Sequence, residues 1–133
     1  MAGFRTHPGE HIIYSEGGVA SFELGSNPTY GEGILTNRRF VHKLSPIFNP
    51  QAYFVFPNGI DLSLPINEVK CFRFEDDLLF IEVDHGEAIR LKVRTSDDWL
   101  NAWQKALGEL HGSAPHEVDN GRWEVTRKPG GDQ

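Results

Sequence analysis

An alternating segment followed directly by a helical one places the strongest constraint on the fold. Apolar residues occupy every second position of residues 88–94, and basic residues stand between them. Such alternation predicts an antiparallel strand with one face buried and the other in water. From Ser96 to Leu110 the apolar period becomes helical, with Trp99 and Trp103 on the apolar face. A chain with this pattern must pack one C-terminal helix against a sheet.

The residues before this segment divide into short apolar or alternating stretches separated by turn residues. Strands are predicted at 11–15, 19–24, 30–36, 39–44, 52–56, 60–64, 69–74 and 78–83. Asn58-Gly59, between two apolar stretches, is the strongest hairpin signal, because both residues tolerate positive φ. We therefore predict a mainly β fold, in which the C-terminal helix closes one end of an antiparallel barrel or sandwich. Trp103 is the residue expected to fill that end.

Length and composition predict a single domain. The 133 residues are 38% hydrophobic and 24% charged, which is typical of one globular unit. We place the domain at 10–111, after a lead-in at 1–9 and before a polar, flexible tail at 112–133. Within that tail, residues 122–127 are the one candidate for a further strand.

The net charge limits the classes of partner that the protein can bind, and the cysteine content bears on its cellular compartment. The formal net charge of -6 argues against nucleic acid, because phosphate neutralisation by Lys and Arg dominates such binding. Cys71 is the only cysteine, so no internal disulfide can form. The N-terminal residues lack the apolar core of a signal peptide, and no apolar run approaches the length of a membrane span. A cytoplasmic protein is therefore expected.

The segment Gly33-Ile-Leu-Thr-Asn-Arg-Arg-Phe40 predicts two strands joined by a tight turn at Thr36 and Asn37. It looks like the Gly-x-Leu-x-Thr-Asn-x-Arg-x hallmark of the GRAM branch of the pleckstrin-homology (PH) superfold. Residues 9–14 are similar to the Gly-Glu-x-apolar lead-in of that branch. Residues 62–69 look like its apolar-Pro-apolar-x-x-Val stretch.

This resemblance covers about residues 9–110, and Trp103 matches the core tryptophan that PH-like domains carry on their helix. It implies a seven-stranded antiparallel barrel or sandwich capped by a C-terminal α-helix. Thr36 and Asn37 would then set the hairpin register, and Trp99 and Trp103 would belong to the core. The family also implies a non-enzymatic module that binds lipid headgroups or proteins.

Three basic residues form the candidate ligand-binding group. Arg38 and Arg39 lie at the predicted turn, and Lys43 follows on the same strand face as Arg39. Arginine matches phosphate oxygens bidentately, so one interpretation is a phosphate-binding patch and the other is a solvated strand face. In PH domains that bind phosphoinositides, the basic motif surrounds the first hairpin loop. Here that loop is expected at 25–32, which contains no Lys or Arg, and this favours the solvated face.

A peptide groove is the other binding mode that the resemblance implies. Related modules add an extended peptide to a strand edge beside the C-terminal helix. Val93, Trp99 and Leu100 would either line such a groove or belong to the core. The core is favoured, because Trp and Leu on a lone helix usually face the sheet.

Catalysis and metal binding are not expected. His7, Glu10 and His11 match the H-x-x-E-H pattern of inverted zinc proteases, but that chemistry needs a helix and Pro8-Gly9 disfavours one. Cys71 lies in a predicted strand and is interpreted as an inert, semi-buried thiol. No nucleophile with a base and no Gly-rich phosphate cradle emerges, so we expect no enzyme, no cofactor and no bound metal.

The favoured function is thus a binding or adaptor module for a protein or peptide. The first alternative is peripheral binding of membrane lipids such as phosphoinositides. The second is a small β-barrel carrier of an apolar ligand, which the terminal position of the helix and the aromatic core disfavour. The sequence leaves the oligomeric state open.

Overall fold

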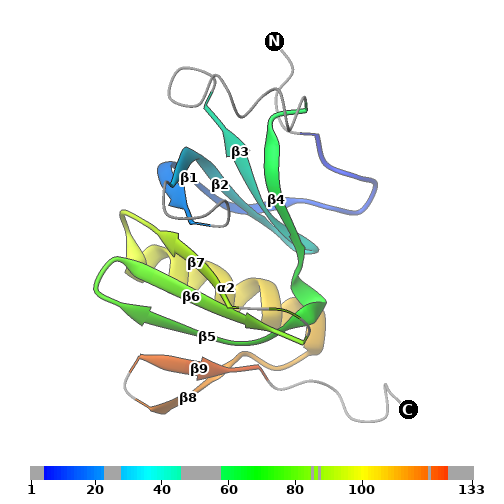
Figure 1. Cartoon of the computed structure of the whole chain (residues 1–133). Coiled ribbons are helices and arrows are strands. Elements are labelled where there is room, and N and C mark those ends of the chain that lie inside the picture. The colour runs from blue at the N-terminus through cyan, green and yellow to red at the C-terminus, as the bar shows by residue number, and fades with distance from the viewer. Residues whose placement is uncertain are drawn as a thin grey trace.

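A computed structural model describes residues 5–22, 28–45, 58–84, 86, 88–119 and 121–125. These residues form one nine-stranded sheet and one α-helix (Figure 1). The strands are β1 (Ile12–Ser21), β2 (Thr29–Thr36), β3 (Arg39–Leu44), β4 (Ile60–Pro65), β5 (Val69–Glu75), β6 (Leu78–Val83), β7 (Ile89–Lys92), β8 (His116–Asp119) and β9 (Arg122–Glu124). A short 3-10 helix, η1 (Ile66–Glu68), links β4 to β5, and the α-helix is α2 (Ser96–His111).

The strand order is β4-β3-β2-β1-β7-β6-β5-β9-β8, and every neighbouring pair is antiparallel. The two halves of the sheet meet where β1 pairs with β7, through Ala20 with Lys92 and Ser21 with Leu91. The expectation of a mainly β chain with a C-terminal helix is confirmed. The helix packs against β1, β2 and η1.

The sheet has two more strands than the seven expected. Both follow the helix, because β8 and β9 form a hairpin that pairs with the outer edge of β5 (Figure 1). Trp123 and Val125 are half-buried against the core, which gives this polar segment an apolar side to anchor it. The sheet therefore continues past residue 111. The predicted strand at 52–56 and the tail beyond residue 125 lie outside the described residues.

One strand replaces the two that were predicted at 11–15 and 19–24. β1 runs through Gly17-Gly18, and its register against β2 shifts between Glu16 and Val19. Gly18 has φ +75°, a conformation that glycine adopts without strain. The glycines therefore form an irregularity within the strand and do not end it. Residues 23 and 24 lie outside the part of the chain that the structure describes.

Aromatic residues fill the space between the sheet and the helix. Trp99, Trp103, Phe40 and Phe72 have no exposed surface. The Trp103 ring centroid lies 6.0 Å from that of Phe40 and 6.0 Å from that of Phe72. Trp103 thus joins β3 to β5, and the prediction that it fills the core is confirmed. Gly33 leaves room for the neighbouring tryptophan, since a Cβ there would stand 3.2 Å from the Trp99 ring.

The two ends of the helix are held in different ways. Gly112 terminates it at φ 81°, in the left-handed region. At the other end, Thr95 holds the N-cap position without a side-chain cap bond. The Thr95 hydroxyl instead donates to the Glu16 carboxylate on β1. A tertiary contact has therefore taken the group that would have capped the helix.

Candidate functional site

The turn between β2 and β3 is held by the residues that lead into β1. The Thr36 hydroxyl donates to Glu10 Oε2 at 2.6 Å and accepts the backbone N–H groups of Arg38 and Arg39 at 3.0 Å each. Asn37 donates through Nδ2 to the Gly9 carbonyl at 3.1 Å. Thr36 and Asn37 therefore fix the turn, as the sequence predicted, and also tie it to the lead-in.

Arg39 is part of this same arrangement. Its Nε donates to Glu10 Oε2 at 2.9 Å, and the Glu10 side chain has no exposed surface. Burial alone would raise the pKa of Glu10, but hydrogen bonds from Arg39, Thr36 and the backbone N–H of His7 outweigh it and lower that pKa to about 2. This guanidinium, a candidate for either a phosphate-binding patch or a solvated strand face, is therefore engaged by a carboxylate of its own chain.

Protonation of Glu10 is expected to destabilise the protein in acid. Its folded pKa of about 2 lies below the ordinary 4.5, so the stabilisation is complete above pH 4.5 and is lost as pH falls toward 2. The shift corresponds to roughly 3 kcal/mol. Unfolding free energies measured by urea titration from pH 6 to pH 2.5 should fall less steeply for Glu10→Gln than for wild type. Glu75→Gln, at a half-exposed side chain, is the matched control; an equal slope for Glu10→Gln and wild type would contradict the assignment.

The three basic residues singled out in the sequence do not converge. Arg38 is exposed, and its guanidinium lies over Gly9, where an added Cβ would come within 2.7 Å of Nη2. Lys43 lies four residues beyond Arg39 on β3, about 13 Å along an extended strand. The face that they were expected to share also carries Val41, which is fully buried. These residues therefore do not form one patch.

A buried polar network that the sequence did not indicate lies between β2, β3 and β4. His42 Nδ1 lies 2.8 Å from Asp61 Oδ1, and His42 Nε2 lies 2.8 Å from the Val19 carbonyl oxygen. The Thr29 hydroxyl donates to Asp61 Oδ2 at 2.6 Å. Neither the His42 nor the Asp61 side chain has exposed surface. Only the pairing of β3 with β4 brings this histidine and aspartate together, so no short motif could reveal them.

The hydrogen bonds of this network determine the ionisation state of Asp61. Burial would raise the pKa of Asp61, but hydrogen bonds from His42 and Thr29 outweigh it and lower that pKa, so Asp61 is a carboxylate. Both ring nitrogens of His42 thus face oxygen atoms, Nδ1 the Asp61 carboxylate and Nε2 the Val19 carbonyl. Asp61 lies between the threonine and the histidine, and Nε2 is occupied by a carbonyl. The arrangement therefore differs from a catalytic triad, in which the histidine contacts the nucleophile.

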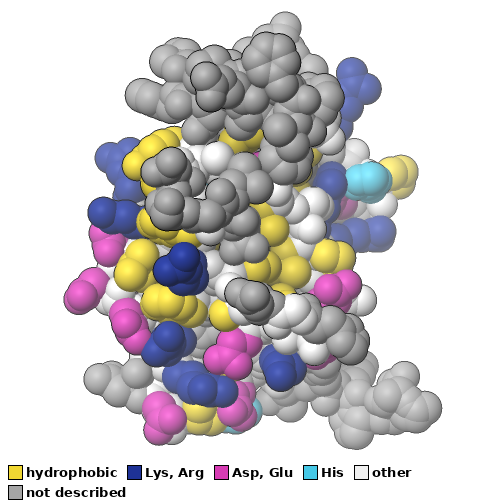
Figure 2. Space-filling view, in the orientation of Figure 1, with side chains coloured by type: hydrophobic (Ala, Val, Ile, Leu, Met, Phe, Trp, Pro, Cys, Tyr) yellow, Lys and Arg dark blue, Asp and Glu magenta, His cyan; other side chains and the backbone are white. Residues whose placement is uncertain are grey.

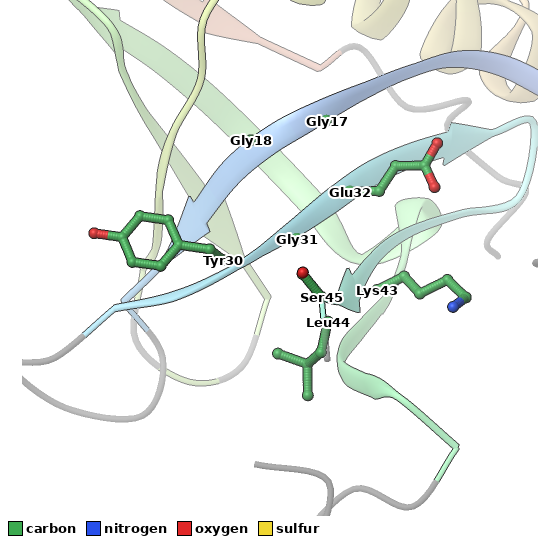
Figure 3. Close-up of a pocket in the computed structure, with 8 residues that line it drawn as sticks. All are labelled: Gly17, Gly18, Tyr30, Gly31, Glu32, Lys43, Leu44 and Ser45. Carbon is green, nitrogen blue, oxygen red and sulfur yellow. The ribbon is translucent and has the colours of Figure 1, made fainter. Parts of the chain in front are cut away.

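A surface hollow lies beside the irregularity in β1. Its volume is about 600 Å³, and Gly17 and Gly18 of β1 border it without side chains (Figure 3). Tyr30 stands at one end, and Glu32 and Lys43 stand at the other (Figure 3). The Tyr30 side chain is 43% exposed. Two glycines inside a strand were the available sequence signal, since such pairs mark bulges and sites of close approach.

A second hollow continues beyond Tyr30 toward β7. Its volume is about 550 Å³, and it shares Gly18 and Tyr30 with the first. Lys92 and Arg94 line it, with Asp77 3.7 Å from the Lys92 amine. We call the combined surface of the two hollows the Tyr30 face; among the residues that line it are Gly17, Gly18, Tyr30, Glu32, Lys43, Asp77, Lys92 and Arg94. Elsewhere, as Figure 2 shows over β5–β9, basic and acidic side chains are interspersed.

The residues proposed to line a peptide groove belong to the core. Val93 and Trp99 are buried, and Leu100 is half-buried against the same cluster. The Trp99 indole N–H donates to Glu16 Oε2 at 3.1 Å. Glu16 also accepts the backbone N–H of Arg94 and the Thr95 hydroxyl, so one carboxylate joins β1 to the start of α2. Burial would raise the pKa of Glu16, but these hydrogen bonds lower it.

The residues that match the zinc-protease pattern, His7, Glu10 and His11, have structural contacts within the fold. Residues 7–10 form a turn, with the Glu10 N–H donating to the His7 carbonyl, and Glu10 is engaged by Arg39 and Thr36. Among the residues with described positions, no three His, Cys, Asp or Glu side chains gather as a metal site. Cys71 is buried, and burial together with Glu82 raises the pKa of its thiol. A thiol of this kind is a poor nucleophile.

A scan against models of known protein families and a search among curated proteins each find no match to this chain. Within the described ranges, α2 falls short of the length and apolar character that a membrane-crossing helix needs. The candidate site therefore rests on the geometry of the chain itself.

Proposed function

We propose that this chain is a non-enzymatic binding module of the PH/GRAM type that docks an acidic segment of a protein partner on the Tyr30 face. The observation that carries the proposal is the pair of adjoining hollows, about 600 and 550 Å³, that share Gly18 and Tyr30. Tyrosine supplies a large contact area with little rotamer freedom to lose, which makes it a frequent anchor of protein interfaces.

The order of elements supports the family assignment. Seven antiparallel strands, β1 to β7, come first, and a helix with a buried Trp103 follows directly. The hallmark turn at Thr36 and Asn37 uses its two polar side chains to bond the lead-in, Thr36 to Glu10 and Asn37 to Gly9. These features agree with the PH/GRAM resemblance in the sequence.

Charge favours an acidic partner segment. Lys43 stands at one end of the Tyr30 face, and Lys92 and Arg94 stand at the other. The same face carries two carboxylates, those of Glu32 and Asp77. Three cations against two carboxylates leave this face with a small positive excess, whereas the whole chain carries a net charge of -6. Complementary charge steers partners and sets their orientation. An extended segment with an apolar residue over the glycines and acidic residues on either side fits this distribution.

Selection from a peptide display library on the immobilised full chain tests the proposal. We expect enrichment of peptides that carry Asp or Glu on both sides of an aromatic or aliphatic residue. The double variant Lys43→Gln/Arg94→Gln should weaken the enriched peptides about tenfold or more, because it removes a cation at each end of the face. Arg38→Gln/Lys105→Gln changes the net charge equally at exposed residues elsewhere and should leave binding unchanged.

Two outcomes would overturn this function. The first is the absence of acidic peptides among the enriched sequences, or equal weakening by both double variants. The second is flotation of the wild-type chain with phosphoinositide liposomes in a salt-sensitive manner that Lys43→Gln/Arg94→Gln abolishes. That result would replace the protein partner by a lipid headgroup.

A further inference from the structure

The outer edge of β5 holds a strand from the C-terminal end of the chain. β9 pairs antiparallel to β5, with Cys71 opposite Glu124, Phe72 opposite Trp123 and Arg73 opposite Arg122. The pairing extends by one hydrogen bond at each end, from the Phe74 N–H to the Gly121 carbonyl and from the Val125 N–H to the Lys70 carbonyl, both at 3.0 Å. We call the edge from Lys70 to Phe74 the acceptor edge.

The side chains of this strand divide between two faces. Trp123 and Val125 turn inward and pack against the core cluster that contains Phe72. Arg122 and Glu124 lie on the outer face, where Arg122 Nη1 comes within 3.9 Å of Glu82 Oε2. The acceptor edge therefore receives a segment of the order basic, aromatic, acidic, aliphatic.

Little of the surface of β8 and β9 is buried against the rest of the fold. Every residue of β8 is exposed, and every residue from Arg122 to Val125 is only half-buried. A two-stranded hairpin is marginally stable by itself, so β8 adds little to the retention of β9. Units with few buried contacts open at a small fraction of the global unfolding free energy.

We propose that the acceptor edge of β5 is a binding site for an extended segment of a protein partner with the order basic-aromatic-acidic-aliphatic. Residues 122–125 occupy this site in the resting chain, and the partner segment displaces them. Main-chain hydrogen bonds to Lys70 and Phe74 would hold the incoming strand, and the space that Trp123 fills beside Phe72 would select its aromatic residue. The site is separate from the Tyr30 face, so either can be lost without the other.

The single native cysteine allows the resident strand to be locked. The bonds at Phe74–Gly121 and Lys70–Val125 make Cys71 and Glu124 a non-hydrogen-bonded pair, in which Cα atoms approach to about 4.5 Å. This separation suits a disulfide. The variant Glu124→Cys should therefore form a disulfide between the introduced thiol and Cys71 under mild oxidation, and reduction should release it.

The test measures binding of a fluorescein-labelled peptide with the sequence of residues 118–126 by fluorescence polarisation. Full-length Glu124→Cys should bind it at least about tenfold more tightly when reduced than when oxidised, because the bridge holds the competitor in place. Trp123→Ala should bind it about tenfold more tightly than wild type, and a peptide with alanine in place of its tryptophan should not bind. Far-UV circular dichroism of each sample checks that the fold is kept.

Equal affinity of the oxidised and reduced variant, or no binding to any of the chains, would overturn the proposal. The proposal would also be overturned if the reduced variant alone formed dimers and the peptide prevented their formation. A second copy of the chain would then be the occupant of the acceptor edge. The Lys43→Gln/Arg94→Gln variant should capture the peptide as wild type does. Loss of capture in that variant would show that the peptide binds the Tyr30 face.

Discussion

Replacing Trp103 by alanine is expected to lower the free energy of unfolding by about 3–5 kcal/mol. Trp103 is fully buried and joins Phe40 of β3 to Phe72 of β5, so its loss opens a cavity at the centre of the core. The surrounding rings belong to separate strands and cannot collapse to fill the space. Urea denaturation monitored by circular dichroism measures the change.

Trp103→Phe is the matched variant. The Trp103 indole N–H has no acceptor among the described residues, so phenylalanine removes an unpaired buried donor along with part of the ring. We expect a cost of about 1–2 kcal/mol, below that of alanine, because the smaller ring leaves a smaller void. An alanine variant as stable as wild type would show that Trp103 does not hold the core together.

Separating His42 from Asp61 is expected to cost about 3–5 kcal/mol in His42→Ala, because a buried charge is left without its partner. Both side chains have no exposed surface, so water cannot replace the lost contact without opening the sheet. The hydrogen bonds from His42 and Thr29 lower the pKa of Asp61 against the effect of burial. Its contribution is therefore present above the ordinary pKa of 3.8 and is lost as pH falls below it.

Thr29→Val is the control for this network. It removes one hydroxyl that donates to Asp61 while leaving the contact between His42 and Asp61, and should cost about 1 kcal/mol. Equilibrium denaturation of the two variants at pH 7 and at a pH well below 3.8 compares them. A His42→Ala cost no larger than that of Thr29→Val would contradict the importance given to the buried contact between His42 and Asp61.

The sequence predicted the parts of this fold that local interactions determine. The turn at Thr36 and Asn37 depends on residues a few positions apart, and it is found where expected. The apolar face of the helix followed from its own period, and Trp99 and Trp103 are buried as a result. Such signals survive because the local preference and the tertiary packing agree.

What the sequence missed depends on contacts between distant segments. Asp61 meets His42 only because β4 pairs with β3, and nothing near either residue marks the other. Arg39 was assigned to a phosphate-binding patch or, preferably, a solvated strand face, but its guanidinium is engaged by Glu10, 29 residues earlier. The hollow beside Tyr30 requires β1 to continue through Gly17-Gly18, where the glycines suggested a break.

The carboxylate of Glu16 also affects when this chain can finish folding. Its partners Arg94, Thr95 and Trp99 lie 78 to 83 residues later, so the first turn of α2 is completed only after almost the whole domain has been made. Long-range closure of this kind slows two-state folding toward milliseconds to seconds. On the ribosome, the early strands are synthesised before α2. The space that Trp103 fills therefore stays empty until the residues of the helix have emerged. We expect chaperone contact to concentrate in that interval, when the apolar sides of β1, β2 and β3 have no cover.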